Sequence, residues 1–295
     1  MRPVRVLSAL IVLGVCSLAS ASQRSAPPAG SKIVGVQKLG RQLYLLTGGG
    51  GNSLAFVTDL GVVLVDTKLA GWGQPLLDAI RTVTTRPVTT IINTHSHVEQ
   101  VGGNESFPTS VEIVAHENTR QYMDSLDAFK GAKVNYLPKL RFREKLTIGS
   151  GKDRVDLLYF GPAHTGGDAW VVFPTEHVAH VGDLVLAKQP PVIDLDHGGS
   201  ALMYSETIAK AATALGGIDR FVPSQGALLT MTDLQEYARF TEDFRDGAVS
   251  AYHHGLGVSE AADAWSIPGR YRGYTTTLER ARANVRVLFS ELTRP

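Results

Sequence analysis

The chain has 295 residues, of which 43% are hydrophobic and 19% charged, with 29 basic side chains against 28 acidic ones. This composition is typical of a globular protein with a sizeable core and excludes a fibrous or largely disordered chain. A near-neutral chain without a basic stripe argues against nucleic acid as a partner.

The N-terminus has the pattern of a secretory signal peptide over residues 1–21. Arg2 and Arg5 precede an apolar run at residues 6–18, and Ala19-Ser20-Ala21 has the form of a cleavage site. The apolar run is too short for a stable membrane anchor. We therefore expect a periplasmic or secreted protein that keeps no membrane anchor after processing.

The predicted cleavage also determines the chemistry available to the mature chain. It would remove Cys16, the single cysteine, and with it disulfides, thiolate ligands and a cysteine nucleophile. It would also leave 27 basic side chains against 28 acidic ones. Residues 22–32 are rich in serine, proline and alanine and predict a flexible lead-in, and residues 33–295 predict one domain.

Strands dominate the first part of that domain. The apolar patterns predict strands at 33–36, 42–47, 53–58 and 62–66, a helix at 74–85, and strands at 88–92 and 111–115. A glycine run at residues 48–51 predicts a flexible hairpin tip. A phosphate-binding loop is the alternative, but no Lys-Ser or Lys-Thr pair follows the run.

The second part alternates strands with longer helices. We expect strands at 155–160, 169–173, 180–184 and 221–223, and helices at 204–215, 232–244, from 259 and at 278–292. Thr232 and Gln235 have the spacing of a capping box. The charge-rich stretch 127–148 is typical of a solvated face. The long loop 187–200 is typical of a functional segment.

The most informative motif follows the strand at 88–92. His95 and His97 stand two residues apart, and Gly102-Gly103 downstream allow the tight turn that could direct both imidazoles to one zinc ion. His164 repeats the design between two apolar runs. Asp183 adds a carboxylate at the end of another short strand, as a metal ligand or a residue behind the ligands.

These motifs resemble those of the metallo-β-lactamase-fold hydrolases, whose sequences run Thr-His-x-His-x-Asp-His-x-Gly-Gly-Asn, then Pro-x-His-Thr-x-Gly-Asp, then Gly-Asp. The resemblance covers roughly residues 33–292. It implies an α/β fold in which two mixed β-sheets flanked by helices form an αββα sandwich. It also implies a metal site held by His95, His97 and His164, with Asp183 as a further ligand.

The chain departs from the family pattern where a second metal would bind. The family's Asp-His is Glu99-Gln100 here, and its late Gly-His-Gly is Ser224-Gln225-Gly226. Amide oxygens are poorer zinc ligands than imidazole nitrogens. We therefore expect about one zinc ion per chain, with Gln100 and Gln225 forming at most a weak second site or part of the cleft.

The resemblance suggests roles for three more residues. Asp66 would support the turn that carries His95 and His97 from behind. His197 would lie at the rim of the cleft, where it contacts substrate or compensates for a lost ligand. Glu99 would act as a general base beside the attacking water, or be a remnant of a lost ligand.

Two functions follow as hypotheses. The first is an exported zinc-dependent hydrolase that opens an ester, lactone or lactam bond of a small molecule by attack of zinc hydroxide. The cysteine-free ligand set is most similar to that of the third subclass of metallo-β-lactamases. The alternative is a catalytically impaired protein of the same fold that binds a metal or ligand. The sequence leaves the oligomeric state open.

Overall fold

The computed structural model describes residues 32–294. The predicted signal peptide and almost all of the predicted lead-in lie outside these residues. Among residues 32–294, no helix combines the length and the apolar composition needed to cross a membrane.

The predicted elements occur in the predicted order, and α2, β7, β8 and short 3₁₀ turns lie between some of them. The strands are β1 Gly35–Lys38, β2 Leu43–Thr47, β3 Ser53–Val57, β4 Val62–Val65, β5 Val88–Ile92, β6 Glu112–His116, β7 Leu140–Phe142, β8 Lys145–Ile148, β9 Val155–Leu158, β10 Trp170–Phe173, β11 Val178–Gly182 and β12 Arg220–Pro223. The helices are α1 Gly73–Arg81, α2 Val98–Val101, α3 Glu117–Ser125, α4 Tyr204–Ala214, α5 Met231–His253, α6 Val258–Ala264 and α7 Leu278–Thr293.

The strands form two mixed sheets. The first has the order β1-β2-β3-β4-β5-β6-β7, antiparallel as far as β4 and parallel from β4 to β7. The second has the order β12-β11-β10-β9-β8, in which β11 and β12 are parallel and the other pairs antiparallel. Each sheet therefore has parallel strands whose carboxyl ends share one edge.

The two sheets pack face to face because their strands alternate between two apolar faces. In β3, Leu54 and Phe56 point into the core between the sheets, whereas Ala55 between them points to the outer face. Phe56 meets Phe173 of β10, with ring centroids 5.1 Å apart. The shared core fixes how the strand ends of one sheet lie against those of the other.

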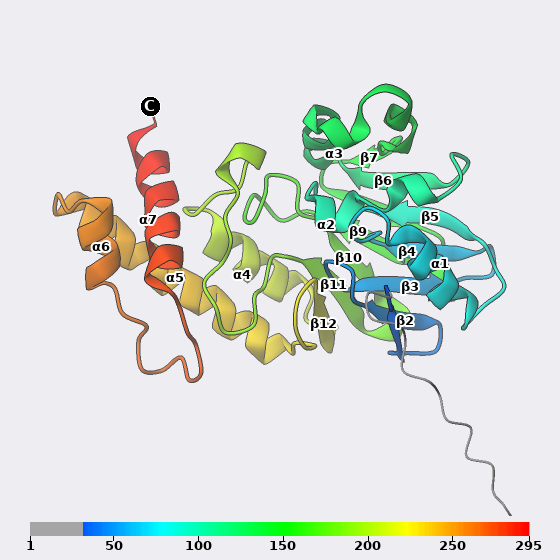
Figure 1. The fold of residues 1–295 in the computed structure, drawn as a ribbon. Coiled ribbons are helices and arrows are strands. Elements are labelled where there is room, and N and C mark those ends of the chain that lie inside the picture. The colour runs from blue at the N-terminus through cyan, green and yellow to red at the C-terminus, as the bar shows by residue number, and fades with distance from the viewer. Residues whose placement is uncertain (1–31, 295) are drawn as a thin grey trace, which may run out of the picture. The chain divides into compact units, whose positions relative to one another are not determined.

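Helices cover both outer faces. Leu76 and Ile80 of α1 pack on the first sheet, and Ile208 of α4 and Tyr237 of α5 pack on the second. Figure 1 shows α1 beside β3 and β4, with α4 and α5 on the side of β10 to β12. This arrangement confirms the predicted αββα sandwich.

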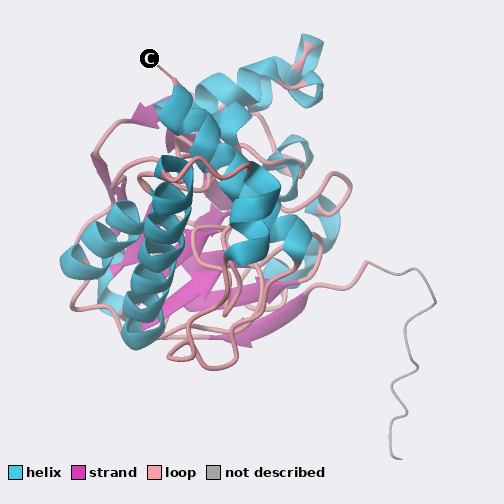
Figure 2. Cartoon of the chain, turned by 90° about the vertical axis from the view of Figure 1, so that its left-hand side faces the viewer, coloured by secondary structure: helices cyan, strands magenta, loops and turns pink. Residues whose placement is uncertain are grey.

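A further helical layer lies beyond α5. The loop that joins β11 to α4, the 187–202 loop, ends near this layer. Its Ala201 shares an apolar cluster with Phe244 of α5, Ala261 of α6 and Val285 of α7. Figure 2, turned toward the side where α5 and α7 lie in Figure 1, shows helices in front of the strands. The C-terminal helices therefore pack against the loop that joins β11 to α4.

Two predictions about α5 are wrong. The capping box of α5 is formed by Thr230 and Asp233, not by Thr232 and Gln235, and α5 continues to His253 because apolar residues past Phe244 pack on α7. The stretch 127–148 also contains β7 and β8, which lie in different sheets. Its lysines and arginines are exposed, as predicted for a solvated face. Its alternating charges mark the edge strands where the chain crosses between sheets.

Candidate metal centre

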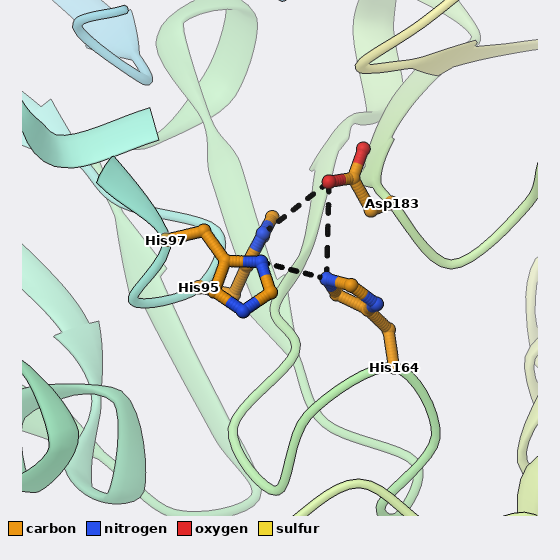
Figure 3. A group of neighbouring side chains, drawn as sticks. All are labelled: His95, His97, His164 and Asp183. Atoms are coloured by element: carbon orange, nitrogen blue, oxygen red, sulfur yellow. Dashed lines mark hydrogen bonds and ion pairs between the residues drawn. The ribbon is translucent and has the colours of Figure 1, made fainter. Parts of the chain in front are cut away.

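Four side chains from three loops meet at one point (Figure 3). His95 and His97 follow β5, and His97 begins α2 as its N-cap residue. His164 lies between β9 and β10, and Asp183 directly follows β11. One ligand atom of each lies within 4.8 Å of the others. The structure thus brings together the three histidines and the aspartate that the sequence singled out.

Hydrogen bonds on the outer side fix how two of the histidines face this point. His164 Nδ1 lies 2.8 Å from Val192 O, which can only accept, so Nδ1 carries the proton and Nε2 a lone pair. His97 Nε2 lies 2.6 Å from Asp194 Oδ2 and donates in the same way, leaving a lone pair on Nδ1. These two inward atoms are 3.1 Å apart with no proton between them.

His95 is oriented through a chain of three residues. Asp66 accepts from Thr94 N and from Thr94 Oγ1, both at 2.8 Å. Thr94 Oγ1 uses its proton on Asp66 and therefore accepts from His95 Nδ1, at 3.1 Å. His95 Nε2 thus also points inward with a lone pair, and it has no hydrogen-bond partner among the described residues. Asp66 lies behind the histidine turn, as the sequence predicted.

Backbone geometry allows Asp183 to approach these histidines. Gly182, at the end of β11, has a φ of +54°. A Cβ atom there would lie 3.1 Å from Thr94 Oγ1 and 3.5 Å from His95 Nδ1. A larger residue at this position would push the two loops apart and move the carboxylate away from the imidazoles.

The donor set fits a zinc ion. Two ligands of a tetrahedral zinc, each 2.0–2.1 Å from the metal, stand about 3.3 Å apart. The inward pairs are His97 Nδ1 to His164 Nε2 at 3.1 Å, His95 Nε2 to Asp183 Oδ2 at 3.5 Å, and His164 Nε2 to Asp183 Oδ2 at 3.8 Å. Three lone pairs and a carboxylate facing one another repel unless a cation lies between them.

The pKa values of the histidines also indicate that a positive charge is needed at this point. Burial lowers the pKa of His164 to about 3, and the charge on His95 adds to that shift. Burial also opposes protonation of His95, but the nearby Asp183 carboxylate, 3.5 Å from His95 Nε2, outweighs burial and raises the His95 pKa. Without a metal, a proton on His95 would therefore supply the positive charge that the cluster needs.

Asp194 is a functional residue that the sequence reasoning missed. Its Oδ2 lies 2.6 Å from His97 Nε2 and 2.5 Å from Nδ1 of His197. Burial raises the pKa of Asp194, but the hydrogen bonds from His97 and His197 outweigh burial and lower it to about 2. The signal available in the sequence was the Asp-x-x-His spacing inside a long loop already marked as functional.

His197 lies where a rim residue was predicted. Its half-buried ring stands edge-on to His97 and to Tyr122, with ring centroids 5.7 and 5.2 Å away. Its side-chain hydrogen bond runs to Asp194, which in turn bonds His97. The short contacts of Asp194 are hydrogen-bond distances, so His197 belongs to a hydrogen-bonded chain on the outer side of His97.

The residues at the expected second metal site lie apart from this cluster. Glu99 is exposed in the first turn of α2 and is not among the acidic groups within reach of the histidines in the described chain. Gln100 is buried, and its Oε1 has no hydrogen-bond partner among residues 32–294. Gln225 is exposed and donates its amide to Gly50 O, so its side chain holds the glycine-rich loop.

A buried lysine anchors the same loop. Lys68 is 1% exposed, and its ammonium donates to Leu46 O at 2.9 Å, before the glycine run, and to Gly51 O at 2.5 Å, at the end of the run. Burial lowers the pKa of Lys68 to about 7. The predicted hairpin tip is therefore tied down at its base, close to α2.

His180 of β11 fastens the far end of that loop. Its Nδ1 accepts from Gly182 N at 3.1 Å, so its Nε2 carries the proton and donates to Asn52 O at 3.1 Å. Burial lowers the pKa of His180 to about 4. The neutral ring joins the strand that carries Asp183 to the base of the glycine-rich loop.

Comparison with known proteins agrees with this geometry. Residues 46–224 match the family model of the metallo-beta-lactamase superfamily. The chain is 30% identical over 228 residues to the 2,4-dinitroanisole O-demethylase subunit alpha of Nocardioides sp. (strain JS1661), an alignment that covers 75% of this chain and 66% of that protein. It is 25% identical over 182 residues to the metallo-beta-lactamase type 2 of Bacillus cereus, covering 59% of this chain and 66% of that protein.

The fold is also found among solved structures. The stereoselective inverting sec-alkylsulfatase from Pseudomonas sp. superposes with a TM-score of 0.72 at 15% identity, covering 88% of this chain and 50% of that one. The alignments with both curated relatives span slightly less than two thirds of the length of each. With the fold, the His/Asp metal site and a family match over more than half of its length, the chain belongs to the metallo-beta-lactamase superfamily.

Proposed function

We propose that this chain is an exported zinc-dependent hydrolase that opens an ester, lactone or lactam bond of a small molecule at a one-metal site. The observation that carries the proposal is the convergence of three imidazole lone pairs and the Asp183 carboxylate on one buried point. The outer hydrogen bonds to Thr94, Asp194 and Val192 fix each ring in its ligating tautomer.

His95, His97 and His164 would hold the zinc. When bound, zinc polarises a carbonyl oxygen and lowers the pKa of a water molecule to about 7. Burial opposes ionisation of Asp183, but the nearby His95 and His164 outweigh it and hold the pKa of Asp183 well below its usual range. The ionised carboxylate would therefore hold the zinc or orient the attacking water. The sequence suggested Glu99 as a general base, but its exposed position in the first turn of α2, apart from the histidine cluster, gives no support to that role.

Two loops would recognise the substrate. Residues 48–52 are held by Lys68 and Gln225, and the 187–202 loop brings the ring of His197 edge-on to His97. His197 is proposed to contact the substrate rather than the metal, because its Nδ1 is already bonded to Asp194.

A second candidate substrate class comes from one relative. The Nocardioides protein that is 30% identical over 228 residues is named as a subunit of a 2,4-dinitroanisole O-demethylase. An activated aryl methyl ether therefore belongs beside esters, lactones and lactams in any substrate panel. A catalytically impaired protein that only binds metal remains the alternative to hydrolysis.

Metal content and turnover test the proposal together. Protein purified without its signal peptide should hold about one zinc ion per chain by elemental analysis. His97→Ala should lose this zinc, and Gln225→Ala should retain it. His164→Ala should lower hydrolysis about a thousandfold or more, because Lewis-acid stabilisation is worth several kcal/mol.

Three results would refute parts of this scheme. Two tightly held metals per chain would mean that Glu99, Gln100 or Gln225 rebuilds the second site. A zinc-loaded wild type without turnover on the whole panel would support the impaired alternative. Equal turnover in His164→Ala and wild type, both correctly folded, would place the chemistry elsewhere.

A further inference from the structure

The loop between β11 and α4 supplies two of the hydrogen bonds that orient the ligand histidines. Val192 O receives the proton of His164 Nδ1, and Asp194 Oδ2 that of His97 Nε2. Asp194 N also donates to His164 O at 2.9 Å. The position of this loop therefore determines the orientation of His97 and His164.

No strand of either sheet lies within this loop, so other elements must hold it. Only a 3₁₀ turn at Leu195–His197 interrupts it. On the inner side, Ser200 N donates to Ala163 O at 3.0 Å and Gly166 N to His197 O at 2.8 Å. These bonds join the loop to the turn that carries His164. They hold the two segments together but do not fix the position of either one relative to the rest of the fold.

Helix α7 contacts the loop from the outer side. Asn284 is 2% exposed, and its Nδ2 donates to Pro191 O at 3.0 Å, one residue before the carbonyl that orients His164. The Glu291 carboxylate accepts from Ala201 N at 2.7 Å and Leu202 N at 3.2 Å at the end of the loop. Both ends of the ligand-orienting segment are thus bonded to one helix.

The helix that makes these bonds lies outside the shared family region. The match to the family model ends at residue 224, whereas α7 spans Leu278–Thr293. Val285 and Phe289 of α7 are buried in the same apolar cluster as Ala201 of the loop. The segment after residue 224 therefore adds contacts to a loop that begins and ends within the matched region.

We propose that Asn284 and Glu291 of α7 are positioning residues that set the metal affinity of the centre through the 187–202 loop. The inference rests on the metal site of the proposed function but not on hydrolysis. Removing the Asn284 amide frees Pro191 O and lets the Val192 carbonyl and Asp194 move away from His164 and His97. Metal ligands whose outer partners are lost typically bind metal 10 to 100 times more weakly, and a residue acting through such a partner should have a smaller effect.

The test measures metal binding by the full mature chain. Zinc dissociation constants come from competition with a chromophoric chelator, and the visible absorption of the Co²⁺-loaded protein reports ligand geometry. Asn284→Ala should weaken zinc binding about 5- to 20-fold and change the Co²⁺ spectrum. Glu291→Gln should weaken it about 2- to 5-fold, and it supplies the test if Asn284→Ala fails to fold.

Thr241→Ala is the matched control. Thr241 is also buried, but its hydroxyl donates only within α5, to Tyr237 O and Ala238 O. This variant should be destabilised while its zinc affinity and Co²⁺ spectrum stay as in wild type. The inference is overturned if the folded α7 variants bind zinc within twofold of wild type, or if Thr241→Ala weakens binding equally. The zinc dissociation constants decide whether α7 sets the metal affinity, whatever the hydrolysis panel shows.

Discussion

Replacement of Asp194 tests the least expected part of the centre. Its carboxylate bonds His97 Nε2 at 2.6 Å and His197 Nδ1 at 2.5 Å, and it remains partly accessible to solvent. Asp194→Ala removes the acceptor that holds His97 in its ligating tautomer and lets the ring rotate away from the other ligands. We expect zinc affinity to fall about 10- to 100-fold, or about 1.4 to 2.7 kcal/mol.

The assay is competition for zinc between the protein and a chromophoric chelator at fixed pH and ionic strength. Asp194→Asn should have a smaller effect, because an amide oxygen still accepts from His97 Nε2 but carries no charge. Asp196→Ala is the control, since it removes the same charge from an exposed position in the same loop. The reasoning fails if Asp194→Ala binds zinc within twofold of both wild type and Asp196→Ala.

Two further predictions concern the supports of the glycine-rich loop. Lys68→Met should lower the free energy of unfolding by about 2–4 kcal/mol, because Leu46 O and Gly51 O lose their donor; a change below about 0.5 kcal/mol in chemical denaturation would contradict this role. Burial holds the pKa of His180 near 4 in the folded chain, whereas an unfolded histidine titrates near 6.5. The unfolded state therefore binds more protons between these values, and stability should fall as pH drops from 6.5 to 4, by at most about 1.4 kcal/mol per pH unit from this one group. His180→Gln should flatten the dependence of the unfolding free energy on pH, whereas His253→Gln, at an exposed position, should not. Equal slopes in the two variants would show that His180 does not cause the pH dependence.

The sequence predicted the fold and the residues of the metal centre, because its motifs resemble those of a known family. The alternation of apolar residues in the strands, and the short motifs carrying His95, His97 and His164, are local patterns that chemistry restricts strongly. Asp66 was expected behind the histidine turn because the family resemblance implies an aspartate with that role, directly after a strand buried on both faces. Local spacing is enough when the ligands lie immediately after strands whose carboxyl ends meet at one edge.

The groups that surround those ligands could be identified only from the tertiary structure. Asp194 and the Val192 carbonyl lie about 30 residues beyond the nearest ligand histidine and reach the centre only because the loop folds back over it. The carbonyl of Val192 cannot be singled out from the sequence, because every residue carries a backbone carbonyl. Asn284 lies in a helix whose amphipathic pattern indicates packing but not its partner. Hydrogen bonds between segments far apart in sequence depend on how the sheets and helices pack, and no local pattern encodes that arrangement.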